Sequence, residues 1–186
     1  YGRSRLFRLP WTCGDRITLT DGKIITIRPA RDEDGEQLGH LIALCWAEYE
    51  GCVFDRDGEM AWLDTVSSDY ESKGGIVWCA ISDERVIGSV AVAPAGQIGG
   101  AWEITKVYVD PSLRRVGLGS RLMHLAEEHA AVGGARRIVL WTDTRFEAAH
   151  RFYECLGYIP DGRTRELNDL SQSIEYFYAK TLAGEV

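Results

Sequence analysis

The sequence predicts an α/β (α+β) protein, with a mixed, mostly antiparallel six- to seven-stranded sheet flanked by about four helices. Three observations carry this prediction. Residues 76–81 and 86–92 are apolar, β-rich runs joined by a short polar link, which is typical of an antiparallel hairpin. Other segments repeat apolar residues every three to four positions, as amphipathic helices do. Residues 102–142 have the pattern strand, helix, strand, and a helical crossover of this kind makes its two strands parallel.

Length and composition indicate one globular domain. A chain of 186 residues can bury a sizeable core without disulfides or metals. The net charge of -7 argues against nucleic acid as the main partner, because a phosphate backbone requires a basic surface. No apolar run reaches the roughly 18 residues of a membrane span. We see no signal-like start either, and therefore expect no membrane partner and a cytoplasmic location.

The five cysteines and four histidines do not have the spacing of a metal site. The cysteines are scattered and odd in number, without a Cys-x-x-Cys pair. Cys45 and Cys79 lie in apolar runs, so we expect small buried side chains in a reducing compartment. We therefore predict no metal.

The first part of the chain is predicted to be an arm in front of the domain. Residues 1–23 interleave arginines with apolar residues and show neither a strand nor a helix period. We divide the chain into this N-terminal arm and a domain at 24–186. The domain begins with a strand at 24–29, which Pro29 ends because proline lacks a backbone donor.

Two helices follow. Asp32 is a candidate cap for a helix at about 33–49, because a carboxylate accepts hydrogen bonds from the first helical amides. The loop 48–59 contains five acidic residues, and a second helix is expected at 60–73. The hairpin comes next.

The second half of the domain has the order strand, helix, strand, helix, strand, strand. Glycines at 133, 134 and 157 end the two helices. The predicted segments are a strand at 102–109, a helix at 118–131, a strand at 137–142, a helix at 147–156 and strands at 158–159 and 174–181.

The turn in front of the helix at 118–131 reads Arg114-Arg-Val-Gly-Leu-Gly-Ser120. A helix start exposes unpaired N–H groups and the positive end of the helix dipole. Gly117 and Gly119 permit unusual dihedrals and let a ligand approach the backbone. These features predict an anion site for a phosphate or pyrophosphate. A tight connector without a ligand is the alternative, and glycine spacing alone does not decide between the two.

These residues resemble the GNAT superfamily of acetyl-CoA-dependent N-acetyltransferases. The family signature Arg/Gln-x-x-Gly-x-Gly/Ala stands here as Arg114-Arg-Val-Gly-Leu-Gly119, after Val109-Asp-Pro111. A second family pattern, Ala-x-x-φ-Tyr-Glu-x-x-Gly-φ with φ apolar, appears as Ala149-His-Arg-Phe-Tyr-Glu-Cys-Leu-Gly-Tyr158. The order of elements agrees from about 24 to 182. Both motifs at this separation make the resemblance specific.

The resemblance implies how acetyl-CoA is bound. Backbone amides at 116–120 would hold the CoA pyrophosphate, and Val107 and Val109 would pair with the pantetheine arm as an extra strand. The amide of Val109 or Tyr108 would polarise the thioester carbonyl. Arg114 and Arg115 would add charge near the phosphates or point to solvent. The implied cofactor-binding set is Val107, Tyr108, Val109, Arg114, Arg115, Val116, Gly117, Leu118, Gly119 and Ser120.

Two side chains are candidates for the catalysis. Tyr153 is the position that the family uses to protonate the departing CoA thiolate, although its helical periodicity is equally that of a core residue. Glu103 is the candidate base that takes a proton from the amine, and some family members use a glutamate there. By strand alternation we expect Glu103 on the face that carries Val107 and Val109. Asp143, at the end of the next strand, is the second candidate base.

One position departs from the family pattern. Many members have Asn where this chain has Phe146, so no side-chain contact to CoA is carried over from that loop. The chain has neither a Gly-x-Ser-x-Gly elbow nor a Cys–His pairing for a covalent acyl-enzyme. We therefore expect direct transfer in a ternary complex.

The main hypothesis is an N-acetyltransferase that moves the acetyl group of acetyl-CoA to a primary amine of a small molecule or peptide. The alternatives are a non-catalytic acyl-CoA-binding regulatory module and a dinucleotide-binding oxidoreductase. Leu122 replaces the third glycine of the dinucleotide fingerprint, which argues against the last class. We expect loops 48–59 and 161–171 to frame the acceptor site. The acidic loop suggests a cationic acceptor such as a polyamine, aminoglycoside or basic peptide, and family analogy favours a homodimer.

Overall fold

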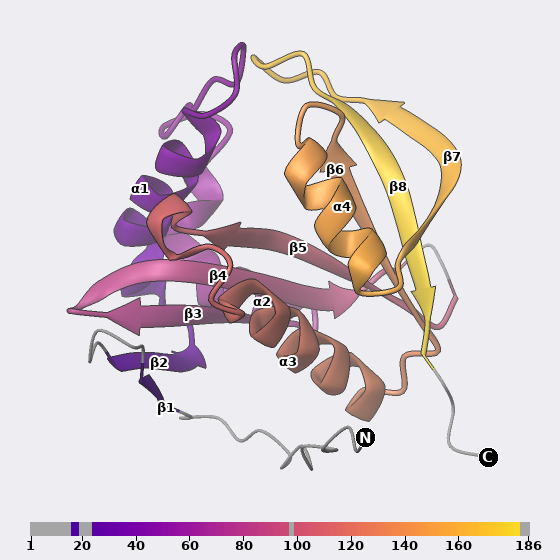
Figure 1. Ribbon diagram of the computed structural model, residues 1–186, viewed down its shortest axis with the longest axis horizontal. Helices are drawn as coiled ribbons and strands as arrows, with labels where there is room; N and C mark the ends of the chain where they lie inside the picture. The colour runs from indigo at the N-terminus through magenta and orange to yellow at the C-terminus, as the bar shows by residue number, and fades with distance from the viewer. Residues whose placement is uncertain (1–15, 19–23, 97–98, 183–186) are drawn as a thin grey trace, which may run out of the picture.

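A computed structural model describes residues 16–18, 24–96 and 99–182. The strands form one sheet in the order β1-β2-β3-β4-β5-β6-β8-β7, shown in Figure 1. The strands are β1 (Arg16–Thr18), β2 (Ile24–Pro29), β3 (Ile76–Ser82), β4 (Arg85–Pro94), β5 (Ala101–Val109), β6 (Arg137–Asp143), β7 (Ile159–Glu166) and β8 (Ile174–Thr181). The α-helices are α1 (Gly35–Trp46), α2 (Val66–Ser72), α3 (Leu118–Val132) and α4 (Glu147–Cys155), with 3₁₀ turns η1 (Asp32–Asp34), η2 (Ala61–Thr65) and η3 (Pro111–Leu113).

The predicted mixed, mostly antiparallel sheet with four helices is confirmed. Within the described residues only β5 and β6 pair in parallel, on either side of the crossover helix α3. The described sheet has eight strands, one more than the upper count expected, because β1 lies in the segment assigned to the arm and pairs with β2. Residues 1–15 and 19–23 of the predicted arm lie outside the described residues.

The expected cap of the first helix is wrong. The Asp32 carboxylate accepts hydrogen bonds from the amides of Ser67 at 2.7 Å and Ser68 at 3.1 Å, so it caps α2. Asp34 lies at the start of α1 and is held by Arg28, with 2.7 Å between Nη1 and Oδ2. The Ser residues that Asp32 caps are 35 and 36 positions away along the chain, and local pattern carries no trace of that contact.

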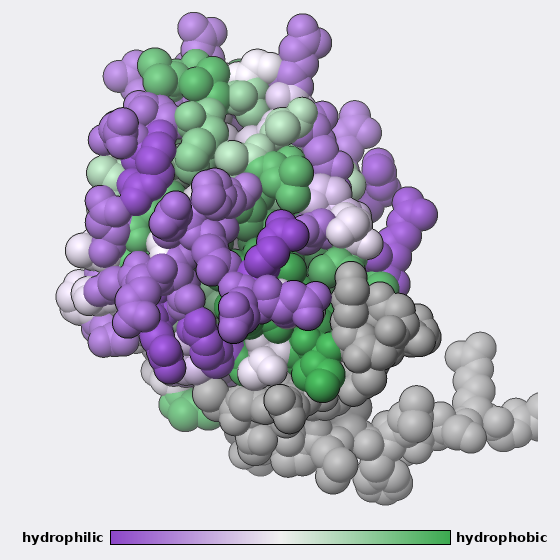
Figure 2. All heavy atoms as spheres, turned by 90° about the vertical axis from the view of Figure 1, so that its left-hand side faces the viewer, coloured by the Kyte–Doolittle hydropathy of each residue, from purple (hydrophilic) through white to green (hydrophobic). Residues whose placement is uncertain are grey.

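The helices cover the two faces of the sheet. The face towards α3 and α4 holds the larger core, in which Leu122, Ala126 and Tyr153 pack with strand residues. The other face, towards α1 and α2, holds a second core that includes the buried Cys45 and Cys79, as predicted. Figure 2 looks onto the α1 side, and hydrophilic residues cover most of that face. None of the described helices is long and apolar enough to cross a membrane.

Strands β5 and β6 separate soon after they meet. Only Ala101, Trp102 and Glu103 of β5 have partners on β6, namely Arg137, Ile138 and Val139. The β6-facing edge of β5 from residue 104 to 109 therefore has no strand partner within the described chain. We call this stretch the open edge of β5.

A bulge at Lys106 interrupts the pairing of β5 with β4. Ser89 pairs with Tyr108 but Ala91 pairs with Thr105, so Lys106 and Val107 together oppose one residue. Lys106 has φ 55, and its carbonyl accepts a hydrogen bond from Ser89 Oγ at 2.7 Å. A left-handed backbone is uncommon for any residue other than glycine.

The bulge makes the predicted placement of Glu103 wrong. The flanking Trp102 and Ile104 lie in the core towards α3, as do Val107 and Val109. Glu103, between them, therefore points to the face of α1 and α2, away from the side of Val107 and Val109. One extra residue in β5 has reversed the alternation on which the expectation depended.

Candidate active site

The start of α3 presents backbone donors. Gly117 is its N-cap with φ 85, and an added Cβ there would meet nothing within 4 Å. The amide of Arg121 bonds the Gly117 carbonyl at 3.1 Å, whereas within the described chain the amides of Leu118, Gly119 and Ser120 have no acceptor. The first turn has no acidic residue. The positive end of the dipole and the unpaired amides are features that suit an anion.

Gly119 brings the two sequence motifs together. A Cβ at this position would lie 3.3 Å from Phe152 Cζ and 3.6 Å from Val109 Cγ2. Phe152 belongs to α4 and Val109 to β5. The start of α3, the second motif and the open edge of β5 therefore meet at this glycine.

The backbone of β5 offers a place for an extended chain. The amide of Asp110 bonds the Ile87 carbonyl on β4 at 2.9 Å. Backbone directions alternate along a strand, so the backbone groups of Val109 and Val107 point to the open edge and those of Tyr108 point to β4. The Val109 carbonyl already accepts from Cys45 Sγ at 3.5 Å, which leaves the Val109 amide for a ligand.

The two arginines of the motif have different surroundings. The Arg114 guanidinium pairs with Glu48, just after α1, with 2.5 Å between Nη2 and Oε2. The Nε of Arg114 lies 3.4 Å from the Val109 carbonyl oxygen. Arg114 therefore ties α1 to the open edge of β5. Arg115 is exposed, has φ 67, and has no ion pair among the described residues.

Tyr153 lies on α4 and is only 6% exposed. Its ring packs in the α3-side core, with ring centroids 6.1 Å from Tyr158 and 5.6 Å from Phe152. Burial raises the pKa of its phenol, so the group stays protonated at neutral pH. In the described part of the chain its hydroxyl has no hydrogen-bond partner, so the phenol keeps an unused donor.

Glu103 is partly buried, and its carboxylate has neither a hydrogen bond nor an ion pair among the described residues. Burial raises the pKa of this carboxyl, Arg165 and Lys106 oppose the shift, and Glu175 adds to it. A carboxylate with a raised pKa is a better proton acceptor.

Asp143 forms an ion pair with Arg145. Its carboxylate accepts from Arg145 Nη2 at 2.6 Å and Nε at 2.9 Å. Burial would raise the pKa of Asp143, but the hydrogen bonds and charge of Arg145 outweigh it and lower the pKa. Arg145 also contacts Ser171 and Ser173, so this pair holds the turn before α4 to the segment before β8. The geometry therefore favours Glu103 over Asp143 as a base.

Comparison with known proteins agrees with this architecture. Residues 32–158 match the model of the acetyltransferase (GNAT) family. The uncharacterized N-acetyltransferase YjgM of Escherichia coli (strain K12) is 30% identical over 129 residues, which cover 68% of this chain and 77% of that protein. The chain belongs to the GNAT acetyltransferase family.

Solved structures share this GNAT fold. A GNAT acetyltransferase from Staphylococcus aureus Mu50 is 21% identical with a TM-score of 0.73, and the match covers 86% of this chain and 99% of that one. The yncA protein from Salmonella typhimurium, solved with its cofactor acetyl-CoA, is 19% identical with a TM-score of 0.64, over 87% of this chain and 96% of that one. The protein is accordingly an acyltransferase of the N-acetyltransferase type.

Phe146, which departs from the family pattern, packs against another aromatic side chain. Phe146 is the N-cap of α4, and its ring centroid lies 4.5 Å from that of Tyr49, just beyond α1. The contact joins the two sides of the fold where many members have an asparagine.

Several carboxylates of the acidic loop 48–59 bind groups of the loop itself or of neighbouring segments. Glu48 pairs with Arg114, and Asp55 accepts from the Gly58 amide at 3.1 Å. Glu59 accepts from the Leu170 amide at 2.7 Å. The second expected loop is shorter than predicted, because β7 extends to Glu166. The two loops are nevertheless bonded to each other, which brings the segments predicted to frame the acceptor together.

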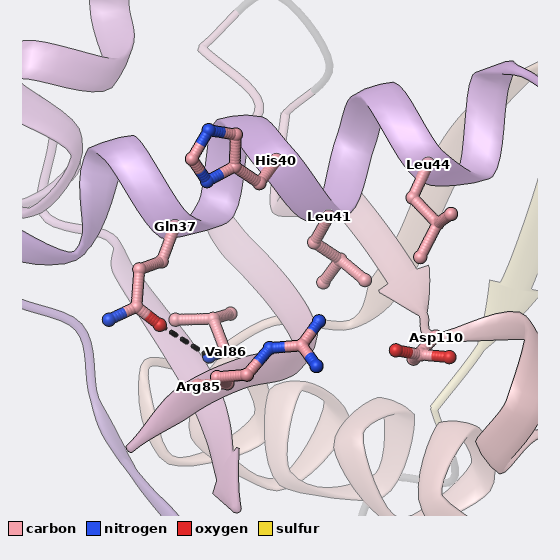
Figure 3. Close-up of a pocket in the computed structure, with 7 residues that line it drawn as sticks. All are labelled: Gln37, His40, Leu41, Leu44, Arg85, Val86 and Asp110. Atoms are coloured by element: carbon pink, nitrogen blue, oxygen red, sulfur yellow. Dashed lines mark hydrogen bonds between the residues drawn. The ribbon is translucent and has the colours of Figure 1, made fainter. Parts of the chain in front are cut away.

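Two hollows of the surface lie apart from the predicted catalytic and acetyl-CoA-binding residues, although Phe54, Arg56 and Asp57 of the acidic loop line the larger one. One of about 260 Å³ is lined by seven residues of α1, β4 and the β5–η3 link, and Figure 3 shows the Val86 amide bonded to Gln37 at its edge. The other, of about 650 Å³, lies beside α1 and η2. None of the predicted site residues lines either hollow. The described residues contain no cluster of three or more metal-ligating side chains.

Sequence reasoning overlooked several residues around Glu103. Lys106, Arg165 and Glu175 all affect its pKa, and the last two lie far along the chain. Arg165 and Glu175 pair across β7 and β8, with 2.5 Å between Nε and Oε2. No local signal marks them, because strand pairing alone brings them to Glu103.

Proposed function

We propose that this protein transfers the acetyl group of acetyl-CoA to a primary amine of a small molecule or peptide, by direct attack in a ternary complex. One observation carries the proposal: the unpaired amides at the start of α3 adjoin the open edge of β5. An anion site continuous with an unpaired strand edge suits a ligand with a pyrophosphate and an extended amide-containing arm.

The residues present fit acetyl-CoA. The amides of Leu118, Gly119 and Ser120 would hold the pyrophosphate, with the exposed Arg115 beside them. The backbone of Val107 and Val109 would align the pantetheine arm. Bound acetyl-CoA supplies an acetyl group activated as a thioester.

The direction of the backbone supports one of two candidate oxyanion donors. The Val109 amide points to the open edge, whereas the Tyr108 amide points to β4. We therefore assign the polarising donor to Val109. Tyr108 contributes its side chain to the core beneath α1 and α2.

Two proton transfers would fall to side chains. A free primary ammonium has a pKa of about 10.4 and must lose a proton before the amine can attack. Glu103 would take that proton, directly or through a water. The new C–N bond forms as the C–S bond breaks, and Tyr153 would donate its proton to the sulfur. Tyr153 lies in the core towards α3, whereas Glu103 points to the face of α1 and α2, so the two groups approach from opposite faces of the sheet.

The test is CoA release by purified protein over a panel of primary amines, with binding of acetyl-CoA measured by calorimetry. We expect turnover that falls in Glu103→Gln and Tyr153→Phe. Tight binding of acetyl-CoA without turnover on any amine, unchanged by either substitution, would contradict the proposal. That outcome would favour the non-catalytic acyl-CoA-binding module.

A further inference from the structure

The bulge in β5 redirects the side chain of Lys106. Regular alternation would place this side chain opposite to Thr105, towards α3. Instead Lys106 Nζ lies 4.2 Å from the centroid of the Trp62 ring on η2, while Thr105 bonds Tyr70 of α2. Two successive side chains of β5 thus lie on the face of α1 and α2. Glu103 lies on the same face, three positions before Lys106.

The ammonium of Lys106 lacks a direct anionic partner. The described chain contains three lysines, and two of them are paired: Lys73 with Asp69 at 2.5 Å and Lys180 with Glu127 at 2.8 Å. Within the described residues the Lys106 ammonium has neither an ion pair nor a hydrogen bond, although the residue is partly buried. The ammonium lies over the Trp62 ring, 4.2 Å from its centroid. Partly buried charges ordinarily have partners, so this site is incomplete.

Glu103 and Lys106 are close neighbours that do not touch. Burial lowers the pKa of Lys106, and the negative charges of Glu175 and Glu103 oppose the shift. The positive charge of Lys106 in turn opposes the upward shift of the Glu103 pKa that burial causes. Each charge acts on the other, yet their N and O atoms are farther apart than an ion pair. A small ligand that carries both charges would give each residue its partner.

We infer that the acceptor is a free α-amino acid, whose amine lies at Glu103 and whose carboxylate pairs with Lys106. The inference rests on the proposed function and names its substrate class. It replaces the cationic acceptor suggested by the acidic loop, in which three of the five carboxylates are already engaged: Glu48 by Arg114, and Asp55 and Glu59 by backbone amides.

Neighbouring groups agree with a dipolar acceptor. Arg165 is a second cation on this side of Glu103, but Glu175 already pairs with it and its guanidinium lies 4.4 Å from the Trp141 ring centroid. Lys106 is therefore the cation whose ammonium has no anionic partner among the described residues. A polyamine would instead place a second positive charge near Lys106, which is repulsive.

The test compares matched acceptors. Rates of CoA release would be measured for the common L-α-amino acids, for each of their α-carboxamides, and for putrescine, spermidine and spermine. An amide keeps the amine and the side chain but removes the carboxylate charge. We expect the preferred amino acid to exceed its amide in kcat/KM by at least about tenfold, the size of one charge-assisted contact.

Lys106→Met tests the residue. Methionine keeps an apolar stem against Trp62 and removes the charge. The substitution should raise KM for the preferred amino acid by about tenfold, and it should lower the preference for that amino acid over its amide by the same factor, a ratio that cancels any change in the pKa of Glu103. Lys73→Met, which removes an exposed lysine just after α2, should change neither the KM nor this preference. Unaltered melting and acetyl-CoA affinity would show that Lys106→Met is folded.

The outcomes separate the two proposals. Amides or polyamines that equal the amino acids in kcat/KM would overturn the inference and leave the proposed acetyltransferase in place. A preference for amino acids that persists in Lys106→Met would also overturn it. Absence of CoA release with every acceptor would contradict the proposed function, and the inference with it.

Discussion

The two halves of the proposed site use different chemical groups of the chain. On the acetyl-CoA side the ligand-binding groups are backbone amides, at the start of α3 and along the open edge of β5. On the acceptor side they are side chains, from β5, β7, β8 and η2. A backbone site depends on a few glycines and a strand edge within one short segment. A side-chain site depends on residues that only the folded sheet brings together.

Arg114 and Arg145 connect these halves to the rest of the fold. Arg114 joins Glu48, after α1, to the Val109 carbonyl on the acetyl-CoA side. Arg145 joins Asp143 to the serines before β8, on the acceptor side. Both are charged contacts at the edge of the site. Substitutions in one half should therefore leave the ligand affinity of the other half unchanged, and the following predictions test this independence.

Glu103→Gln should have the largest effect. Removal of a general base commonly costs about a hundredfold or more in rate, so kcat/KM should fall by at least that factor. The base must be ionised, so in the wild type kcat/KM should decline as the pH falls through the raised pKa of Glu103. This decline should be absent from the variant. The measurements are pH–rate profiles and calorimetric titration of acetyl-CoA, whose Kd should not change. A weakened Kd would show that the halves are coupled.

Tyr153→Phe should lower kcat by about tenfold, which is less than the loss expected at Glu103. A thiolate whose conjugate acid has a pKa of about 8.5 leaves readily even without a proton donor. The hydroxyl has no hydrogen-bond partner among the described residues, so the melting temperature should change little. Single-turnover CoA release and thermal unfolding check both points. An unchanged kcat would make Tyr153 a plain core residue.

Asp143→Asn should lower the free energy of unfolding by about 2 kcal/mol at neutral pH, because Arg145 loses its charged partner. The pKa of Asp143 is lowered in the folded protein, as Arg145 outweighs burial. The stabilisation is therefore present above the ordinary aspartate pKa of about 3.9 and is lost as the pH falls through the lowered value. Urea unfolding at neutral pH and at acid pH should show a deficit that shrinks on acidification. A deficit of equal size at both would exclude the ion pair as its cause.

Gly117→Ala should have the smallest effect. No atom lies where the new Cβ would stand, so the cost is the left-handed backbone alone, about 1 kcal/mol. We expect about a fivefold weaker acetyl-CoA Kd, with the preference among acceptors unchanged. Gly96→Ala is the matched control, because its added Cβ also meets nothing within 4 Å and its φ is not positive. Equal effects of the two substitutions would contradict a role for the Gly117 conformation.

The predictions that the structure confirms depended on local pattern. The hairpin of β3 and β4, the helix α3 and its glycine N-cap follow from alternation, from helical spacing and from the dihedral freedom of glycine. The acetyl-CoA half of the site lies within one continuous stretch from β5 to α3. Its candidate residues could therefore be named from the sequence, although their roles remain predictions.

The errors share one cause, which is contact between distant residues. Asp32 was expected to cap its own helix, but its carboxylate accepts hydrogen bonds from the amides of Ser67 and Ser68. Glu103 was placed on the wrong face, because Thr105-Lys-Val107 contains no glycine to indicate a bulge. The bulge is fixed by the pairing with β4 and by the bond from Ser89 to Lys106.

The sequence by itself determined the order of the elements, the GNAT family and the backbone turn that suits a pyrophosphate. These depend on residues a few positions apart, whose interactions are the same in any fold that contains the segment. Only the tertiary structure decided which charged side chains surround Glu103. The left-handed backbone of Lys106 directs its own side chain to that face. The pairing of β7 with β8 brings Arg165 and Glu175 there. The balance of charge in the acceptor half is a property of the folded sheet, because no neighbouring residues along the chain produce it.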